Sequence, residues 1–131
     1  MLSLLRGYRF RPASRFVAPF SSTTCTSAKK AYLVIVNDFK DPDALSRRLQ
    51  VRSEHLLEAK ERRKQGVLLS GGALLDSHES GKMTGSALVF NAESPDEVLD
   101  LLKSDPYTIG RAWDLGSVKI FPFRDAGIHH E

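Results

Sequence analysis

The sequence predicts an α+β domain with the element order β-α-β-β-α-β. Four short stretches rich in apolar and β-branched residues predict strands, and two stretches with helix start signals follow the first and the third of them. The chain has 131 residues, a length that suits one domain. Its hydrophobic and charged fractions, 41% and 27%, are typical of a globular protein.

The first predicted strand and helix occupy residues 31–36 and 41–65. Residues 31–36 form a short apolar run, which predicts a strand that is buried on both faces or central in a sheet. Asp41 is expected to cap the helix, with Pro42 in the first turn. Neither Gly nor Pro follows until Gly66, which is expected to end the helix.

Two neighbouring stripes run along this predicted helix. The first begins with leucines and becomes polar, and the second carries basic residues and a histidine. The first comprises Leu45, Leu49, Ser53, Leu56 and Lys60, and the second comprises Arg48, Arg52, His55, Ala59 and Arg62. The basic run at residues 62–64 is expected to lie on a solvated face, where it complements the helix dipole.

Two further strands are predicted at residues 67–75 and 84–90. The polar residues 76–82 between them predict a hairpin loop. The first of these strands contains Gly71 and Gly72. Glycine inside a strand marks a bulge, or lets another backbone or a ligand approach closely.

The second helix is predicted to begin after Ser94, and a last strand follows it. Ser94 is expected to be the cap, with Pro95 in the first position and Glu97 completing a capping box. The helix must end before Pro106, because a residue that precedes proline is driven out of the helical region. Residues 117–123 alternate and predict a strand at the edge of the sheet, since they contain a proline.

This order is that of the ferredoxin-like arrangement, an antiparallel sheet with both helices on one face. The other face of the sheet needs a cover as well. The apolar strand positions that cannot all face two helices include Val67, Leu69, Leu88, Phe90 and Val118. A second copy of the chain would bury that face, so we expect a homodimer.

Residues 1–28 have the composition of a mitochondrial transit peptide. Residues 1–30 contain six basic and no acidic residues, and apolar side chains are interspersed among the arginines. We expect residues 1–28 to be cleaved and the mature protein to lie in the mitochondrial matrix; the alternative is a disordered basic tail. The folded domain is expected over residues 29–124, with a flexible tail at 125–131.

Charge and cysteine content argue against several classes of function. The net charge of +3 conceals the basic leader, and the chain after residue 30 holds 13 basic against 16 acidic residues, so no nucleic-acid partner is expected. Cys25 is the only cysteine, which excludes an intrachain disulfide and a multi-thiolate metal site. No apolar run reaches the roughly 20 residues that span a bilayer. His78, His129 and His130 lie in a loop and the tail and do not predict a metal site.

His55 is the main candidate for chemistry. It lies one helical turn from Arg52, where it would serve as a general acid or base. The alternative is a structural histidine that makes one hydrogen bond. Arg52 would hold an anionic group of a substrate, or else form a salt bridge with an acid such as Asp105. Tyr107 and Trp113 are expected in an apolar wall or a dimer contact.

Five collinear motifs resemble the YCII-related family over residues 31–124. They are RRLQVRSEHL at 47–56, LSGG at 69–72, TGS at 84–86, DPY at 105–107 and VKIFPF at 118–123. The resemblance implies a dimeric α+β barrel built from ferredoxin-like protomers. It also implies a pocket in each protomer with a His–Asp pair, which corresponds to His55 and Asp105. The family often has Gly-Pro where this chain has Gly71-Gly72, so the backbone is looser at that pocket wall.

These residues then have expected roles. Asp105 would orient the imidazole of His55 and stabilise its charged form, or alternatively organise the turn that ends the helix. The residues expected to bind the substrate beside Arg52 are Ser70, Gly71, Gly72 and Ser86. The alternative for either glycine is close packing of the strands.

The chain is therefore expected to be a small enzyme that transfers protons, by isomerisation, elimination or hydrolysis, on a small cyclic or aromatic anion. One member of the family resembles a dehydrochlorinase of a chlorinated hydroxyquinone. No metal or organic cofactor and no membrane partner are expected. The alternative is a non-catalytic ligand-binding or assembly module that uses the same pocket or the barrel face.

Overall fold

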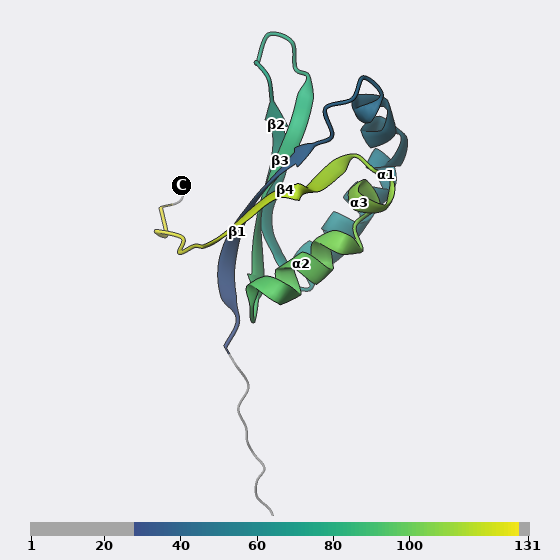
Figure 1. Ribbon diagram of the computed structural model, residues 1–131. Coiled ribbons are helices and arrows are strands. Elements are labelled where there is room, and N and C mark those ends of the chain that lie inside the picture. Colours follow the sequence, from purple (N-terminus) through teal and green to yellow (C-terminus); the bar gives the residue numbers. More distant parts are fainter. Residues whose placement is uncertain (1–27, 129–131) are drawn as a thin grey trace, which may run out of the picture.

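The computed structural model describes residues 28–128 and has the predicted element order (Figure 1). The strands are β1 (Lys30–Asp38), β2 (Leu68–Leu75), β3 (Met83–Ala92) and β4 (Trp113–Pro122); the helices are α1 (Ala44–Lys64), α2 (Pro95–Lys103) and α3 (Pro106–Ile109). The predicted transit peptide, apart from residue 28, lies outside the described residues, as do His129 and His130. No helix within residues 28–128 is long and apolar enough to cross a membrane.

The four strands form one antiparallel sheet in the order β2-β3-β1-β4. Strand β1 is central, and its Val34 pairs with Leu88 of β3 on one side and Ile120 of β4 on the other. Strand β4 lies at an edge, as its proline predicts. The helices all lie against one face of the sheet (Figure 1), which confirms the ferredoxin-like α+β arrangement.

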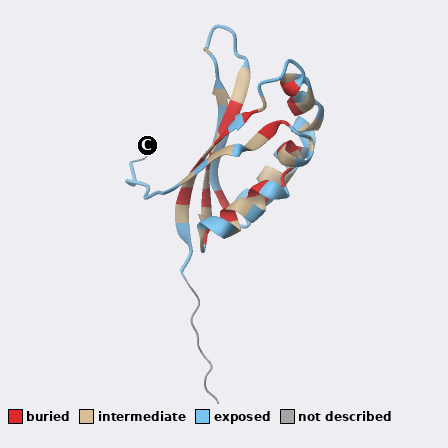
Figure 2. Cartoon of the chain, in the orientation of Figure 1, coloured by how far each residue is buried: buried red, intermediate tan, exposed pale blue. Residues whose placement is uncertain are grey.

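The hydrophobic core lies between the sheet and the helices (Figure 2). Val34 and Val36 of β1, Phe90 of β3, and Val98 and Leu102 of α2 are all buried there. The residues that alternate with these valines in β1 are only half buried. Of the two alternatives predicted for the first strand, the central position in the sheet is confirmed. Burial on both faces is not found in the single chain, because no helix within residues 28–128 covers the second face of the sheet.

Helix α1 buries a polar face. Its buried residues are Ala44, Arg48, His55 and Arg62, whereas Leu49 and Leu57 are 54% and 68% exposed. The prediction of a solvated face for Arg62 is wrong. Its guanidinium donates to the backbone oxygen of Leu101 at 3.1 Å and to the hydroxyl of Ser104 at 2.9 Å, and these bonds compensate for its removal from water.

The start of α1 also differs from the prediction. The helix begins at Ala44, and the cap position belongs to Asp43, whose side chain makes no capping hydrogen bond. Asp41 instead accepts a hydrogen bond from the Asp43 N–H at 3.2 Å and pairs with Arg47 at 2.7 Å. Asp41 therefore organises the turn before the helix. Gly66 follows the helix with a φ of 75°, as a terminating glycine does.

The segment after β3 contains one element that the sequence analysis missed. Ser94 caps α2 as predicted, since its hydroxyl accepts from the Glu97 N–H at 3.2 Å, while the Glu97 carboxylate accepts from the Glu93 N–H rather than closing the box on Ser94. Helix α3 was not predicted, because Pro106 was interpreted only as a stop. Strand β4 begins at Trp113, four residues before the predicted start.

Candidate active site

A cavity of about 370 Å³ lies between α1 and the strands β2 and β3. Its lining contains every residue predicted to bind or act on a substrate except Asp105, which lies behind the wall in the core. The predicted residues that line it are Arg52, His55, Ser70, Gly71, Gly72 and Ser86. They come from three separate segments of the chain, so the fold brings them together.

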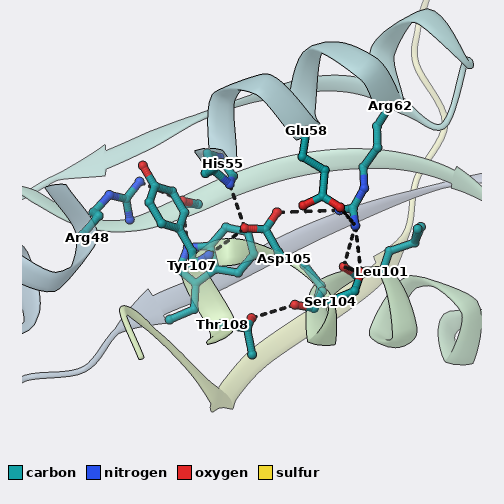
Figure 3. Close-up of polar contacts among 12 residues, drawn as sticks. Arg48, His55, Glu58, Arg62, Leu101, Ser104, Asp105, Tyr107 and Thr108 are labelled. Carbon is teal, nitrogen blue, oxygen red and sulfur yellow. Dashed lines mark hydrogen bonds and ion pairs between the residues drawn. The ribbon is translucent and has the colours of Figure 1, made fainter. Parts of the chain in front are cut away.

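His55 and Asp105 form a buried pair at this wall (Figure 3). The Nδ1 of His55 lies 2.8 Å from Oδ1 of Asp105, and the two residues are 8% and 3% exposed. The same oxygen accepts a hydrogen bond from the Tyr107 N–H at 2.9 Å. Because Asp105 precedes a proline, its backbone is extended, which makes it the cap of α3 and aims its carboxylate at the helix amides. Asp105 therefore organises a turn and also holds the histidine.

Arg62 completes the environment of Asp105. Its guanidinium lies 3.6 Å from Oδ2 of Asp105, the oxygen that faces away from His55, and 3.1 Å from Glu58 (Figure 3). The carboxylate thus meets a donor or a cation at both oxygens, which suits an ionised group. Sequence analysis missed this role. The available signal was the spacing of seven residues between His55 and Arg62, which places both on one face of α1.

The hydrogen bond to Asp105 decides which nitrogen of His55 carries the proton. A carboxylate only accepts, so a neutral imidazole holds its proton on Nδ1 and leaves the lone pair on Nε2. Nε2 of His55 has no hydrogen-bond partner within residues 28–128. It is not one of the polar atoms that are both fully buried and without a partner, and His55 lines the cavity. The basic nitrogen therefore faces the cavity.

Aromatic rings fix the plane of the imidazole. The ring of Tyr107 stacks on His55 with centroids 3.8 Å apart and an angle of 18°, and Trp113 meets His55 edge-on at 5.5 Å. Tyr107 lines the cavity, and burial raises the pKa of its phenol despite the nearby Arg48 and Arg52. Trp113 was expected in a wall or a dimer contact, but it lies in the core, 1% exposed. It fits there because its indole N–H reaches the hydroxyl of Ser86 at 3.1 Å.

A second buried ion pair lies beside the first. Arg48 donates to Asp38 at 2.8 Å and to the hydroxyl of Ser86 at 3.0 Å. Burial raises the pKa of the Asp38 carboxyl, although Arg48 opposes that shift. Oδ2 of Asp38 and Nε of Arg48 are buried without a partner among the described residues. This pair was not predicted, because Asp38 lies just after the first predicted strand and has no local sequence signal for a partner.

The charge at the cavity wall is of one sign. The charged residues in the lining are Arg48, Arg52, Lys60 and Arg63, and none of the described residues in the lining is an acid. The alternative considered for Arg52, an ion pair with Asp105, does not form, and no ion pair of Arg52 occurs within residues 28–128. Arg62 takes the place next to Asp105. A wall of this kind attracts anions.

The floor of the cavity is open because of a bulge and a glycine in β2. The register with β3 shifts between Leu68 and Ser70, so that Gly71 pairs with Leu88. A Cβ atom on Gly71 would lie 3.1 Å from the side chain of Leu88, which lines the same cavity. A Cβ on Gly72 would meet nothing within 4 Å. Because Gly71 has no side chain, the floor of the cavity carries no side-chain atoms at this position.

Residues 31–124 match the YCII-related domain family. The chain belongs to this family. Fusaric acid biosynthesis protein 2 of Gibberella fujikuroi is 32% identical over 99 residues, which are 72% of this chain and 93% of that protein. Aspercryptin biosynthesis cluster protein B of Emericella nidulans is 30% identical, over 74% of this chain and 64% of that protein.

A solved structure shares the fold of this YCII-related chain. It is that of 5-chloro-2-hydroxyhydroquinone dehydrochlorinase from Burkholderia phenoliruptrix AC1100, in complex with 2,5-dihydroxybenzoquinone. The similarity has a TM-score of 0.60 at 25% identity, and it covers 72% of this chain and 93% of the dehydrochlorinase.

Proposed function

We propose that this protein is a small enzyme that transfers protons on a small cyclic or aromatic anion, with His55 as the general base and acid. The observation that carries the proposal is the buried contact of 2.8 Å between His55 and Asp105 at the wall of a cavity whose charged lining is entirely basic. In this reaction Nε2 of His55 takes a proton from the substrate and returns it later, or passes it to water. Asp105 keeps the imidazole in the required tautomer and stabilises the imidazolium.

Arg52 holds the anionic group of the substrate in this proposal. Arg52 lies one turn of α1 before His55 and has no competing ion pair among the described residues. Its planar guanidinium can donate two parallel hydrogen bonds to a carboxylate or a pair of enolate oxygens. The related dehydrochlorinase was solved with 2,5-dihydroxybenzoquinone, a ring with acidic oxygens, which supports this class of substrate. The cavity of about 370 Å³ has room for one such ring.

Exchange of substrate hydrogens for deuterium tests the proton transfer directly. The protein is incubated in D₂O with 2,5-dihydroxybenzoquinone, and the ring hydrogens are followed by proton NMR. We expect the wild type to accelerate their loss and His55→Gln to slow it by roughly 10²–10⁴-fold. His78→Gln is the matched control, because His78 is exposed in the loop between β2 and β3. Ligand binding without acceleration of exchange would instead favour the non-catalytic binding module.

We also propose that the protein is a homodimer joined through the helix-free face of the sheet. That face carries Leu33 and Ile35 of β1, Val89 of β3 and Phe121 of β4, and Phe121 is 46% exposed in the single chain. Apolar residues of this kind on a sheet surface favour burial against a second copy. Light scattering after gel filtration at micromolar concentration measures the mass of the particle.

Finally, we propose that residues 1–28 direct the protein to the mitochondrial matrix. The support is compositional: the segment is rich in Arg, Ser and Thr and has no acid. A fusion of the full chain to a fluorescent protein should enter mitochondria, and the same fusion without residues 1–28 should not. Identical distributions of the two fusions would contradict the proposal.

A further inference from the structure

The hydroxyl of Ser86 is held by two groups that can only donate hydrogen bonds. A guanidinium N–H of Arg48 lies 3.0 Å from Oγ, and the indole N–H of Trp113 lies 3.1 Å from it. Ser86 is 2% exposed and belongs to the central part of β3, where it pairs with Val36 of β1. Its oxygen is therefore fixed in position by the core.

These two hydrogen bonds limit the direction in which Ser86 can donate its hydroxyl hydrogen. A serine oxygen has two lone pairs, and the N–H groups of Arg48 and Trp113 occupy both of them. The hydrogen must then be donated elsewhere, and no hydrogen bond donated by Ser86 occurs within residues 28–128. Ser86 lines the cavity, so the direction left for this hydrogen is toward a bound molecule.

We propose that Ser86 is a catalytic residue that donates a hydrogen bond to the oxyanion formed when His55 removes a proton. This inference rests on the proposed function. It names the group that stabilises the negative charge left on the substrate after His55 has taken the proton. Donors fixed in advance at the place where negative charge develops lower the barrier more than they strengthen substrate binding. The Arg48 cation strengthens Ser86 as a donor by withdrawing charge from its oxygen.

The proton and electron balance of the step is simple. Nε2 of His55 takes a proton from a carbon next to a substrate carbonyl, the C–H electron pair becomes part of a carbon–carbon double bond, and the carbonyl oxygen gains the negative charge. The hydroxyl of Ser86 hydrogen-bonds that oxygen and keeps its own proton. In an isomerisation His55 returns the proton at another carbon; in an elimination the carbonyl re-forms and the leaving group departs with its bonding pair.

Arg48, Trp113 and Asp38 are positioning residues in this scheme. Asp38 accepts a hydrogen bond at 2.8 Å from the terminal nitrogen of Arg48 that does not contact Ser86, and both side chains are almost fully buried. This ion pair holds the guanidinium of Arg48 in place at the cavity wall, where it donates to the hydroxyl of Ser86. A fixed Ser86 needs no reorganisation during the reaction.

The test compares Ser86→Ala with Ser46→Ala, which removes a hydroxyl from an exposed position of α1 outside the cavity lining. The probe is 2,5-dihydroxybenzoquinone, and the readouts are its dissociation constant and the rate of deuterium exchange at its ring. We expect Ser86→Ala to slow exchange by roughly 10²–10³-fold while affinity falls by less than about tenfold. Ser46→Ala should leave both within about twofold. Ser86→Cys, which keeps the volume but donates weakly, should also slow exchange by at least about tenfold.

Several results would overturn the inference. An exchange rate for Ser86→Ala within about threefold of the wild type would do so, as would equal losses of rate and affinity, since these indicate ground-state binding alone. If Ser86→Ala does not fold, the Ser86→Cys rate decides in the same way. Exchange that is lost in His55→Gln but kept in both Ser86 variants refutes only this role for Ser86. A wild type that neither binds the probe nor exchanges its hydrogens refutes the proposed function as well.

Discussion

Replacing Asp105 by Asn should destabilise the fold by about 3 kcal/mol. The carboxylate accepts two hydrogen bonds, at 2.8 and 2.9 Å, and lies 3.6 Å from the guanidinium of Arg62. Making both bonds neutral removes about 1 kcal/mol each. The oxygen of Asn must stay on the Tyr107 N–H, so its NH₂ group faces the donors of Arg62, at a further cost of about 1 kcal/mol.

This magnitude lies at the lower end of the range of about 3–5 kcal/mol for breaking a buried ion pair. The reason is that Arg62 keeps its contacts with Glu58, Leu101 and Ser104. Urea unfolding measures the change, followed by the fluorescence of Trp113, the only tryptophan and a buried one. With an m-value of about 2 kcal/mol per M, the midpoint should fall by about 1.5 M.

Asp100→Asn is the matched control for this measurement. Asp100 lies near the end of α2 with an exposed side chain that makes no hydrogen bond within residues 28–128, and its substitution should change stability by less than about 0.5 kcal/mol. If Asp105→Asn unfolds within about 1 kcal/mol of both the wild type and the control, the charge on Asp105 contributes nothing to the fold. The account of Arg62 and His55 around it would then be wrong.

Three further predictions concern other parts of the molecule. The hydrogen bond from Arg47 lowers the pKa of Asp41 from 3.8 to about 2, so the pair stabilises the fold above pH 3.8 and this contribution disappears as the pH falls toward about 2. Arg47→Gln should return the Asp41 pKa, measured by NMR titration, toward 3.8; an unchanged value contradicts the pairing. Gly85→Ala should lose about 2–3 kcal/mol in urea unfolding, because its Cβ would lie 2.5 Å from a backbone oxygen of β1, whereas Gly72→Ala should lose less than about 1 kcal/mol. Equal midpoints for the two would refute this. Phe121→Asp should convert the proposed homodimer to a monomer in light scattering, and a monomeric wild type would contradict the dimer.

The order of the main elements could be predicted from the sequence because each has a local signal. Apolar runs mark the strands, and capping residues such as Ser94 mark the helices. Helix α3 also has a capping residue, Asp105, followed by Pro106, but its four residues are too few for a periodic pattern, and Pro106 was interpreted only as a stop. The start of β4 was missed for a related reason. Asp and Gly, which occur here as Asp114 and Gly116, are rare in strands, and the pairing of Trp113 and Asp114 with Asp38 and Asn37 of β1 holds this end of the strand in the sheet.

The polar side of the candidate site was harder to predict. Sequence patterns assign arginine to solvent, because an unpaired charge in the core is costly. Arg48 and Arg62 are buried only because partners from distant segments meet them, Asp38 from β1 and Ser104 from the end of α2. Such pairs depend on the tertiary fold. His55 and Asp105 were paired on the family resemblance, and spacing alone did not bring them together.

Acidic and basic side chains lie on different sides of the cavity wall. Helix α1 can therefore contribute buried residues to the core and also basic residues to a ligand site. The two acids that are buried within residues 28–128, Asp38 and Asp105, lie behind the wall, where Asp38 binds Arg48 and Asp105 orients His55. Neither acid lines the cavity, so their negative charges act mainly on their partners in the core, Arg48 and His55. Arg52 is left to act on an anion. An acid introduced on the wall, as in Ser70→Asp, should therefore weaken binding of an anionic probe while leaving the buried pairs, and hence the stability, nearly unchanged.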